Sequence, residues 1–307
     1  MTRVLLTGAS GLFGANFLWQ YASHYELMAA THRHPLKTSV ATSLTLDITD
    51  GAAVMAAVRR LQPDVIVHAA AMAGVDACED QPELAMAINA AGPAHLADAA
   101  AAVGAALIAL STDYVFDGVR GRYREDDPPN PLGVYARTKR LGEEAVLARC
   151  PRATVVRTTL YGWNAQPKQS FAERVLIGAE RSDPTTAFVD MYWSPILAND
   201  LADAVAALIA RPTPGLLHIA GRQRCSRYEF ACAVATTFGH DPATVVRPGR
   251  LVEARLKAPR PPDASLDVTR AERVLARALP GLQAGLDRMR LLHAQGLVPQ
   301  LQRLLAG

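Results

Sequence analysis

Within the first 160 residues of the chain, short apolar runs alternate with stretches of helical periodicity. Strands are predicted at the apolar runs RVLLTG (3–8), YELMAATHR (25–33), DVIVHAAA (64–71), ALIALST (106–112) and ATVVRTT (153–159). Helices are predicted between them, over 13–23, 52–61, 83–104 and around Tyr135. Because strands that alternate with helices are joined by right-handed crossovers, this order predicts an α/β fold with a doubly wound parallel sheet.

The regular alternation ends near residue 162, and mainly helical patterns follow around 170–180, 228–239 and 282–296. We therefore expect two domains. Residues 1–162 would form the sheet and a dinucleotide site, and residues 163–307 would form a smaller, mainly helical, C-terminal substrate-binding domain. The apolar helical pattern at 198–212 predicts that a segment near 189–212 returns to the sheet.

Charge and cysteine content argue against several classes of function. The net charge of +3 comes from scattered arginines, so no nucleic-acid partner is expected. The four cysteines, at positions 78, 150, 225 and 232, lack paired metal-ligand spacing, so we expect neither a metal site nor a disulfide. No segment has the pattern of a membrane span or a secretion signal. The expectation is a cytoplasmic protein, without a membrane partner, that binds a small molecule.

The segment TGASGLFG (7–14) places three glycines between the first predicted strand and the first predicted helix. Glycine lets the backbone come close to a pyrophosphate, whose charge is met by N–H groups at the start of the helix. We favour a dinucleotide site here over an ordinary glycine-rich turn. The residues expected to form it are Gly8, Ser10, Gly11, Leu12, Phe13 and Gly14.

The end of the second strand indicates which dinucleotide is preferred. An NAD-binding domain would hold the adenosine ribose there with Asp or Glu, but this chain has His32 and Arg33. A guanidinium suits a 2′-phosphate, so NADP(H) is expected in preference to NAD(H), which stays an alternative. Asp47 either contacts the adenine edge or caps the following turn. The other residues expected to line the cofactor groove are Ile48, Ala69, Ala70 and Ala71.

The stretch VYARTK places Tyr135 and Lys139 four residues apart. With eight tyrosines and few lysines, this spacing would arise by chance roughly one time in ten. On a helix, which Asn130 and Pro131 predict to begin just upstream, the two side chains would share one face. Gly142 would lie on that face and leave room for a ligand. An ammonium about 6 Å from the phenol contributes about 2.8 kcal/mol at an effective dielectric of 20, so we expect Lys139 to lower the pKa of Tyr135.

Four motifs in order, TGASGLFG, HAAAMAGVDACE, LSTDYVFDG and VYARTK, resemble the extended short-chain dehydrogenase/reductase family, which has a Rossmann fold. Within it, the chain is most similar to dTDP-4-dehydrorhamnose reductases. That similarity rests on STDYVFDG, DDPPNPLGVYARTKRLGEEAV, GLLHIAGRQRCSRYEFA and PRPPDASLDVTRAERVL, and it covers nearly the whole chain. The resemblance implies a cytoplasmic, NADPH-dependent reductase of a keto-sugar nucleotide in deoxysugar biosynthesis.

The resemblance also implies a catalytic trio of Thr112, Tyr135 and Lys139. Tyr135 would donate a proton to the oxygen formed as a hydride attacks the C4 ketone of the substrate. Thr112 would hydrogen-bond the same oxygen, and Ser111 is the competing hydroxyl. Lys139 could also hold the nicotinamide ribose.

For the substrate, the resemblance implies a cradle of positive charge around a diphosphate, with Arg222 as a further candidate. The substrate-binding residues that it implies are Tyr114, Tyr161, Trp193, Arg224 and Arg260. Two segments depart from the usual reductase pattern. RTTLYGW has Leu160 where a tryptophan is usual, and VDMYWSPI stands where Asp, Gln and small residues precede a proline. The substrate is therefore left open between dTDP-4-dehydrorhamnose, another 4-keto sugar nucleotide and a molecule of another class.

Two alternatives remain beside the reductase. Nucleotide-sugar epimerases use the same trio, whereas dehydratases carry an Asp-Glu pair after the threonine, where this chain has Asp113 and Tyr114. The regulatory subunit of methionine adenosyltransferase resembles the same subfamily and binds NADP without catalysis. A homodimer is a further open expectation.

Overall fold

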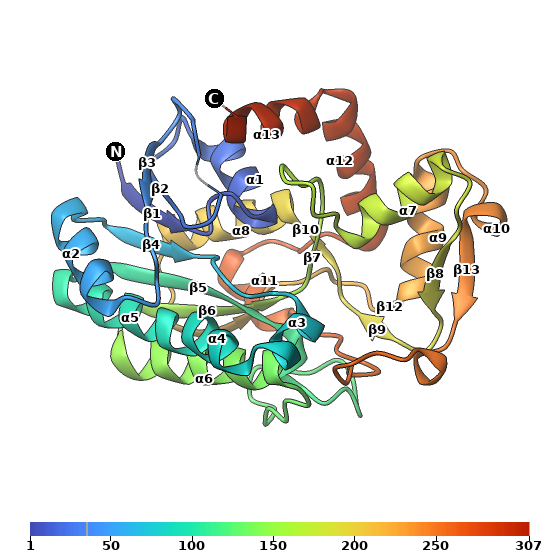
Figure 1. Cartoon of the computed structure of the whole chain (residues 1–307), viewed down its shortest axis with the longest axis horizontal. Coiled ribbons are helices and arrows are strands. Elements are labelled where there is room, and N and C mark those ends of the chain that lie inside the picture. Colours follow the sequence, from blue (N-terminus) through green and yellow to red (C-terminus); the bar gives the residue numbers. More distant parts are fainter. Residues whose placement is uncertain (35, 307) are drawn as a thin grey trace.

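The computed structural model describes residues 1–34 and 36–306, and its centre is a seven-stranded parallel sheet (Figure 1). The strand order is β11-β6-β5-β4-β1-β2-β3, and all neighbouring pairs are parallel. The strands are β1 Arg3–Thr7, β2 Glu26–Thr31, β3 Thr42–Thr45, β4 Val65–His68, β5 Ala106–Thr112, β6 Ala153–Thr158 and β11 Gly215–His218. The doubly wound parallel sheet predicted from the sequence is confirmed.

Two strands of this sheet were not predicted, and both lie at its edges. In β3 three of the four residues, TSLT, are exposed, and in β11, GLLH, only the last two are buried. An edge strand pairs on one side only and is less buried than a central strand. Its sequence therefore lacks the continuous apolar run that indicates the inner strands.

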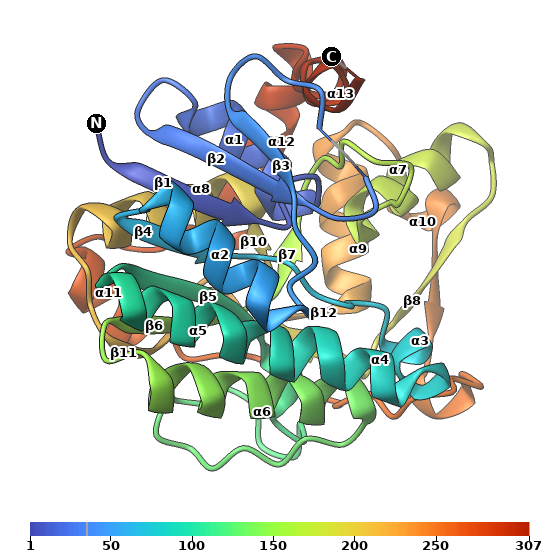
Figure 2. The same ribbon diagram turned by 60° about the vertical axis from the view of Figure 1, so that its left-hand side comes forward.

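Helices cover both faces of the sheet. α2 Gly51–Leu61, α5 Gly92–Val103 and α6 Val134–Arg149 lie side by side on one face (Figure 2), and α1 Leu12–Tyr21 packs with α8 Ala198–Ala210 on the other. Successive residues of a strand point to opposite faces, so Val4 and Leu6 join the core of α1 and α8, whereas Leu5 joins that of α2 and α5. Among the described helices, we find none whose length and apolar character would suit a membrane crossing.

The helix predicted over 83–104 contains a widened turn. After α3 Val75–Asp80, the chain forms α4 Pro82–Met86, a π-helical turn at Ala87–Ala91 and then α5. Pro93 lacks an N–H and cannot continue the regular hydrogen-bond pattern into α5. Within the turn, buried Asn89 accepts a hydrogen bond from Met72 N (2.9 Å) and donates to Met72 O (3.1 Å). The turn therefore holds the loop that follows β4.

The helix that carries Tyr135 begins later than predicted. α6 starts at Val134 after Gly133, because Glu79 Oε1 accepts from the first-turn N–H of Val134 at 2.6 Å. Asn130 instead donates to Asp117 Oδ2 at 3.0 Å. The expectation that Gly142 leaves room for a ligand is also wrong. A Cβ at this position would lie 2.2 Å from the carbonyl oxygen of Asn89, so the space at Gly142 is taken by the π-helical turn.

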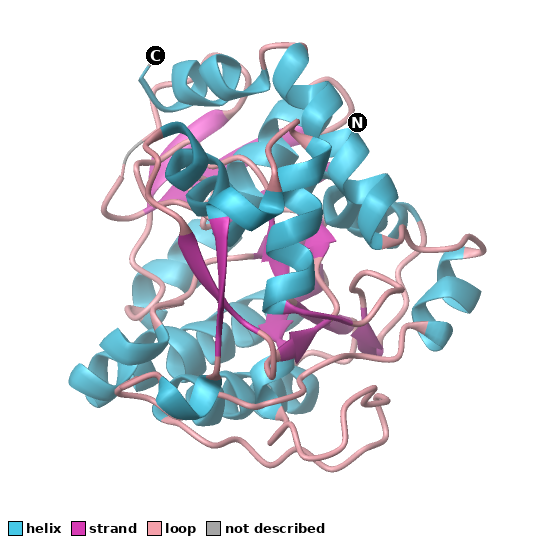
Figure 3. Ribbon diagram, turned by 90° about the vertical axis from the view of Figure 1, so that its right-hand side faces the viewer, coloured by secondary structure: helices cyan, strands magenta, loops and turns pink. Residues whose placement is uncertain are grey.

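A smaller, mainly helical lobe packs beside the carboxyl ends of the strands; Figure 3 faces it. Its helices are α7 Phe171–Glu180, α9 Arg227–Thr237, α10 Pro242–Val245 and α12 Leu282–Ala294, and it has a short 3-10 turn at Leu251–Glu253. Another short 3-10 turn, Asp113–Val115, directly follows β5. Its short strands are β7 Leu160–Tyr161, β8 Thr185–Phe188, β9 Tyr192–Trp193, β10 Ile196–Leu197, β12 Cys225–Ser226 and β13 Val246–Gly249. α7 and α9 both begin at capping boxes, formed by Ser170 with Glu173 and by Ser226 with Glu229.

The chain enters and leaves this lobe more than once. α8 and β11 leave the lobe and join the sheet. α8 lies within the segment near 189–212 that was expected to return there, and β11 lies just beyond that segment. α11 Thr269–Leu275 then packs on β11 and α8, and the last helix, α13 Leu297–Ala306, packs on α1.

The contact between α6 and the π-helical turn can be tested with Gly142→Ala. Alanine is the better helix former, but its Cβ has no space without a backbone shift, so we expect a net loss of about 1–3 kcal/mol in the free energy of unfolding. Urea denaturation measures it. Glu144→Ala, an exposed change on the same helix, should alter stability by less than about 0.5 kcal/mol. Equal effects of the two changes would contradict this packing.

Candidate active site

Two adjoining cavities follow the carboxyl ends of the strands. One, of about 490 Å³, lies at the ends of β1, β2 and β4, and the other, of about 600 Å³, reaches the ends of β5 and β6. They share residues of the glycine loop and of the loop after β4. The structure places every predicted cofactor residue in these walls: Gly8, Ser10, Gly11, Leu12, Phe13, Gly14, His32, Arg33, Asp47, Ile48, Ala69, Ala70, Ala71, Tyr135 and Lys139.

The glycine loop is packed too tightly for side chains. Gly8 has a φ of +71°, and a Cβ there would lie 2.6 Å from Ala70 N. A Cβ at Gly14 would lie 2.3 Å from Gly8 O. Gly11 is the N-cap of α1 and offers no side chain to the free N–H groups of the first turn. The loop thus presents backbone donors at a helix start, the arrangement that a pyrophosphate requires.

At the far end of the groove, Arg33 is exposed and, among the described residues, forms no ion pair. Asp47 caps its turn, since Oδ1 accepts from the N–H and the hydroxyl of Thr49 at 2.9 and 2.7 Å. These bonds are the main reason that the pKa of Asp47 is lowered. Asp47 Oδ2 lies 3.8 Å from His32 Nε2. Asp47 therefore caps its turn, and its side chain also lines the cavity, where contact with the adenine edge stays a prediction.

Thr112, Tyr135 and Lys139 all line the 600 Å³ cavity. The Thr112 hydroxyl accepts from Tyr114 N (3.2 Å) and donates to Asp113 Oδ1 (3.0 Å). Lys139 Nζ donates to Leu110 O at 2.8 Å. Ser111, the competing hydroxyl, also lines this cavity, but it donates its proton to Glu143 Oε1 at 2.6 Å.

The expectation that Lys139 lowers the pKa of Tyr135 is wrong for this structure. Burial raises the pKa of Tyr135 well above its ordinary value, and the nearby Thr112 hydroxyl opposes the shift only partly. Burial also lowers the pKa of Lys139 to about 8, while Glu143 raises it. A phenol taken out of water keeps its proton, because the cost of desolvating the phenolate exceeds the help from its neighbours. Tyr135 is therefore a neutral phenol rather than a phenolate at neutral pH.

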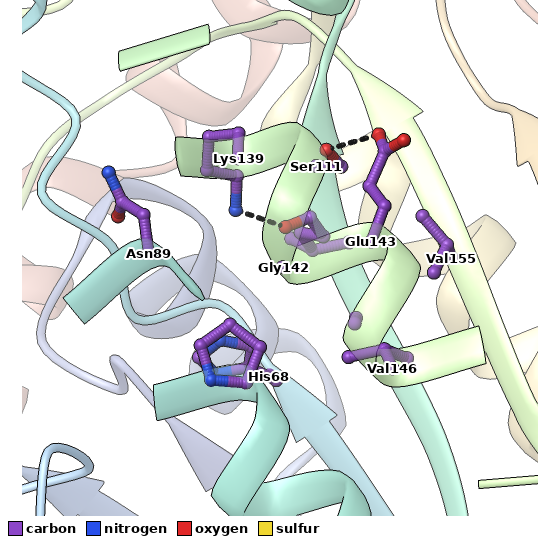
Figure 4. A pocket seen from close by; sticks show the side chains of 11 residues that line it. His68, Asn89, Ser111, Lys139, Gly142, Glu143, Val146 and Val155 are labelled. Carbon is purple, nitrogen blue, oxygen red and sulfur yellow. Dashed lines mark hydrogen bonds between the residues drawn. The ribbon is translucent and has the colours of Figure 1, made fainter. Parts of the chain in front are cut away.

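Beneath Lys139 lies a cavity of only about 10 Å³, which His68, Asn89, Ser111 and Glu143 help to line (Figure 4). Burial lowers the pKa of His68 to about 3, so this imidazole is neutral, and its Nδ1 pairs with Thr7 Oγ1 at 2.7 Å. Glu143 lies one helical turn after Lys139, and its carboxylate accepts from Arg157 Nη2 at 2.8 Å. Lys139, the candidate catalytic lysine, is thus surrounded on this side by buried polar groups.

A third cavity, of about 620 Å³, adjoins the second on the side of the smaller lobe, and Tyr114, Gln169, Phe171 and Arg227 line both. The residues that line it include Arg174, Arg181, Arg227 and Arg260. Arg260 pairs with Asp76 at 2.9 Å, but the other three form no ion pair with any described carboxylate. Arg227 stacks on Trp193, with its guanidinium carbon 3.4 Å from the ring centroid. Asp76 and Asp183 also line this cavity, so the four arginines leave its wall with a net positive charge, which favours an anion.

Not all of the predicted substrate residues meet at these cavities. Tyr114, Trp193 and Arg260 do, and so does Leu160. Tyr161 does not, because its side chain is 1% exposed and packs edge-on against Phe230. Arg224 stacks on Tyr192 and pairs with Asp263 at 2.7 Å, and Arg222 pairs with Glu272 at 2.8 Å. Tyr161, Arg222 and Arg224 are absent from the cavity walls described above.

Sequence reasoning missed Arg174, Arg181 and Arg227. In an arginine-rich chain, no local pattern separates these three from surface arginines. A sequence indication exists only for Arg227, which lies within the quoted segment GLLHIAGRQRCSRYEFA, three residues after Arg224.

A comparison with known proteins agrees with this geometry. The profile of the family described as RmlD substrate binding domain matches residues 1–292. The chain belongs to the RmlD substrate binding domain family. It is 39% identical to a dTDP-4-dehydrorhamnose reductase of Streptomyces griseus over 274 residues, which are 87% of this chain and 86% of that one. This RmlD-family chain is also 33% identical to methionine adenosyltransferase 2 subunit beta of Xenopus tropicalis, over 89% of its length and 82% of the relative's.

Among solved structures, the dTDP-4-dehydrorhamnose reductase of Bacillus anthracis in complex with NADP superposes with a TM-score of 0.85 at 28% identity. The superposition covers 95% of this RmlD-family chain and 99% of that enzyme. Both lobes of the present structure therefore have counterparts in that reductase.

The arginine-lined cavity predicts binding of a nucleoside diphosphate such as dTDP. A charge-assisted hydrogen bond contributes about 1.5–3 kcal/mol, so Arg227→Ala should weaken binding by about 10- to 100-fold in calorimetry. Arg224→Ala is the matched control, because Arg224 also stacks on an aromatic ring, 3.6 Å from the centroid of Tyr192, but is absent from the cavity wall. Equal losses in both variants would show that the cavity is not the anion site.

Proposed function

We propose that this protein is an NADPH-dependent reductase of a keto-sugar nucleotide, similar to dTDP-4-dehydrorhamnose reductase. The observation that carries the proposal is the convergence of Thr112, Tyr135 and Lys139 on the cavity that also contains the glycine loop. The named relatives of the same family support it.

The proposed cofactor lies along the first two cavities, with its pyrophosphate at the glycine loop and its adenosine between His32, Arg33 and Asp47. When bound, NADPH supplies the hydride that attacks the ketone carbon. Arg33 would pair with the 2′-phosphate, which NADH lacks. NADP(H) is therefore preferred, and NAD(H) is the alternative.

Tyr135 is proposed to donate the proton to the ketone oxygen. Its raised pKa keeps the hydroxyl protonated at neutral pH, so the proton is present when the carbonyl carbon is reduced. The phenol then loses its proton to the new alcohol and regains one from solvent. Lys139 lines the same cavity, its ammonium donates to Leu110 O at 2.8 Å, and it is proposed to hold the nicotinamide ribose of the cofactor.

The proposed substrate is an anionic nucleotide sugar, whose sugar lies in the 600 Å³ cavity and whose diphosphate meets the arginines beyond Tyr114 and Phe171. Leu160 and Trp193 would form apolar walls of the sugar site. The proposal includes a cytoplasmic location and a homodimer, and size-exclusion chromatography with light scattering tests the dimer.

A second candidate is a non-catalytic, NADP-binding regulatory subunit, favoured by the 33% identity to methionine adenosyltransferase 2 subunit beta. The trio, complete and lining a cavity with space for a substrate, argues for the reductase.

The test is a screen of 4-keto nucleotide sugars with NADPH, followed at the absorbance of the reduced nicotinamide and by product stereochemistry. Oxidation of NADPH is expected. A changed sugar without NADPH consumption would identify an epimerase. Tight NADPH binding without turnover of any keto sugar would favour the regulatory subunit.

Changing Tyr135 to Phe removes the proposed proton donor but keeps the ring. Turnover should fall by about 100-fold or more, while NADPH binding, measured by fluorescence titration, should stay within about twofold. Near-normal turnover would remove Tyr135 from the mechanism.

Changing Arg33 to Ala should raise the Kd for NADPH by about 10-fold or more and leave that for NADH within about twofold, because only NADPH carries the 2′-phosphate. His34→Ala, an exposed change one residue away, serves as the control. An equal loss for both cofactors would contradict the role of Arg33.

A further inference from the structure

The loop between β7 and α7 belongs to the smaller lobe, but its middle contacts the glycine loop of the sheet domain (Figure 1). Gln166 Nε2 donates to the backbone oxygen of Ser10 at 2.8 Å. At the end of the loop, Ser170 is the N-cap of α7, and its hydroxyl donates to Gly162 O at 2.7 Å. We call residues 164–169 the strap. These bonds hold the strap beside the glycine loop.

Lys168 is the charged residue of the strap, and it lines both of the first two cavities. The other residues common to the two walls carry no charge, and they come from the glycine loop and from the loop after β4. They are Gly8, Ser10, Ala70, Ala71 and Ala73. Lys168 therefore lies where the two cavities join, at the glycine loop.

The other ionisable side chains of this groove lie toward its two ends. His32, Arg33 and Asp47 line only the cavity at the adenosine end. Asp113, Lys139 and Arg227 line only the cavity that contains the proposed catalytic trio. Between these groups, at the glycine loop, Lys168 is the single charged side chain among the described residues that line both cavities.

This place in the groove is where an anion needs a cation. The glycine loop offers backbone N–H groups at the start of α1, which match a pyrophosphate in geometry but carry only partial charges. Each phosphate of a pyrophosphate is ionised at neutral pH. A nearby ammonium adds a full positive charge and charge-assisted hydrogen bonds.

The ammonium of Lys168 is also free to take a ligand. Its residue is exposed, and among the described residues it forms no ion pair, whereas Lys257 of the same lobe pairs with Asp80. A lysine with no partner in the wall of two cavities can pair with a bound anion without first breaking a contact of the fold.

We propose that Lys168 binds the pyrophosphate of the dinucleotide cofactor, so that this group is held by the backbone of the glycine loop and by a cation from the smaller lobe. The inference rests on the cofactor half of the proposed reductase function. The pyrophosphate is common to NADPH and NADH, whereas the 2′-phosphate is not. Lys168 therefore sets the affinity for both cofactors, and Arg33 sets the preference between them.

The test measures the Kd of NADPH and of NADH by fluorescence titration and the Kd of dTDP by calorimetry. Lys168→Gln removes the charge and keeps a side chain of similar length. It should raise the Kd of both cofactors by the same factor, about 5- to 10-fold, as expected for one charged contact at an exposed position. The Kd of dTDP should stay within about twofold, because Lys168 is absent from the wall of the arginine-lined cavity.

Salt dependence separates a charged contact from a structural effect of the substitution. At about 0.5 M NaCl the Debye length falls to about 4 Å, so the difference in Kd between the wild type and Lys168→Gln should shrink to about twofold. Lys168→Arg keeps the charge and should stay within about threefold of the wild type. Lys257→Gln is the matched control, because Lys257 is exposed in the same lobe and is absent from all three cavity walls.

Several results would overturn the inference. A loss for NADPH alone would assign Lys168 to the 2′-phosphate, and a loss for dTDP would assign it to the substrate. Unchanged affinity for both cofactors, or an equal loss in Lys168→Gln and Lys168→Arg, would also contradict a charged contact with the pyrophosphate.

The same measurements distinguish this inference from the proposed function. A wild type that binds NADPH but reduces no keto sugar would contradict the reductase, while the variants still decide the role of Lys168. Normal turnover together with an unchanged Kd in Lys168→Gln would overturn the role of Lys168 alone. A wild type that binds neither dinucleotide would overturn both.

Discussion

The inner strands of the sheet are buried on both faces, and this constraint decides where chemistry can take place. Leu5, Leu6, Val67 and Leu107 have no exposed surface, because helices cover them from either side. Polar side chains on these strands can reach a ligand only where a strand ends. Thr7, His68 and Thr112 occupy such ends in β1, β4 and β5, and the cavities open beyond them.

A buried ion pair between Glu143 and Arg157 lies next to the helical turn that bears Lys139. Glu143 and Arg157 are each 1% exposed at the side chain and pair at 2.8 Å, and Arg157 also lies over the Phe116 ring at 5.0 Å from its centroid. Removing one partner of such a pair typically costs about 3–5 kcal/mol, because a charge is left uncompensated in the interior. This pair connects α6 with β6 next to the turn that bears Lys139. The position of the lysine thus depends on an ion pair that touches neither proposed ligand.

The sequence predicted the features that depend on neighbouring residues. The alternation of strands and helices was confirmed, and the glycine loop and the i, i+4 pair of Tyr135 and Lys139 line one cavity, as expected from their spacing. It did not predict the two edge strands, the π-helical turn or the later start of α6. Each of these depends on partners far along the chain, such as Met72 with Asn89 and Glu79 with Val134.

The order of strands and helices in the sequence alone therefore determined the sheet and the edge of the sheet at which a ligand can bind. The reason is that right-handed crossovers and the burial of the inner strands are compatible with only a few topologies. The tertiary structure decided which charges matter at that edge. In the folded chain, Arg174, Arg181 and Arg227 line a cavity, whereas Arg224 is paired with Asp263. Tyr135 and Asp113 are buried, and burial raises the pKa of each side chain. The reason is that burial and long-range pairing set the local charge, and neither can be read from the spacing of residues.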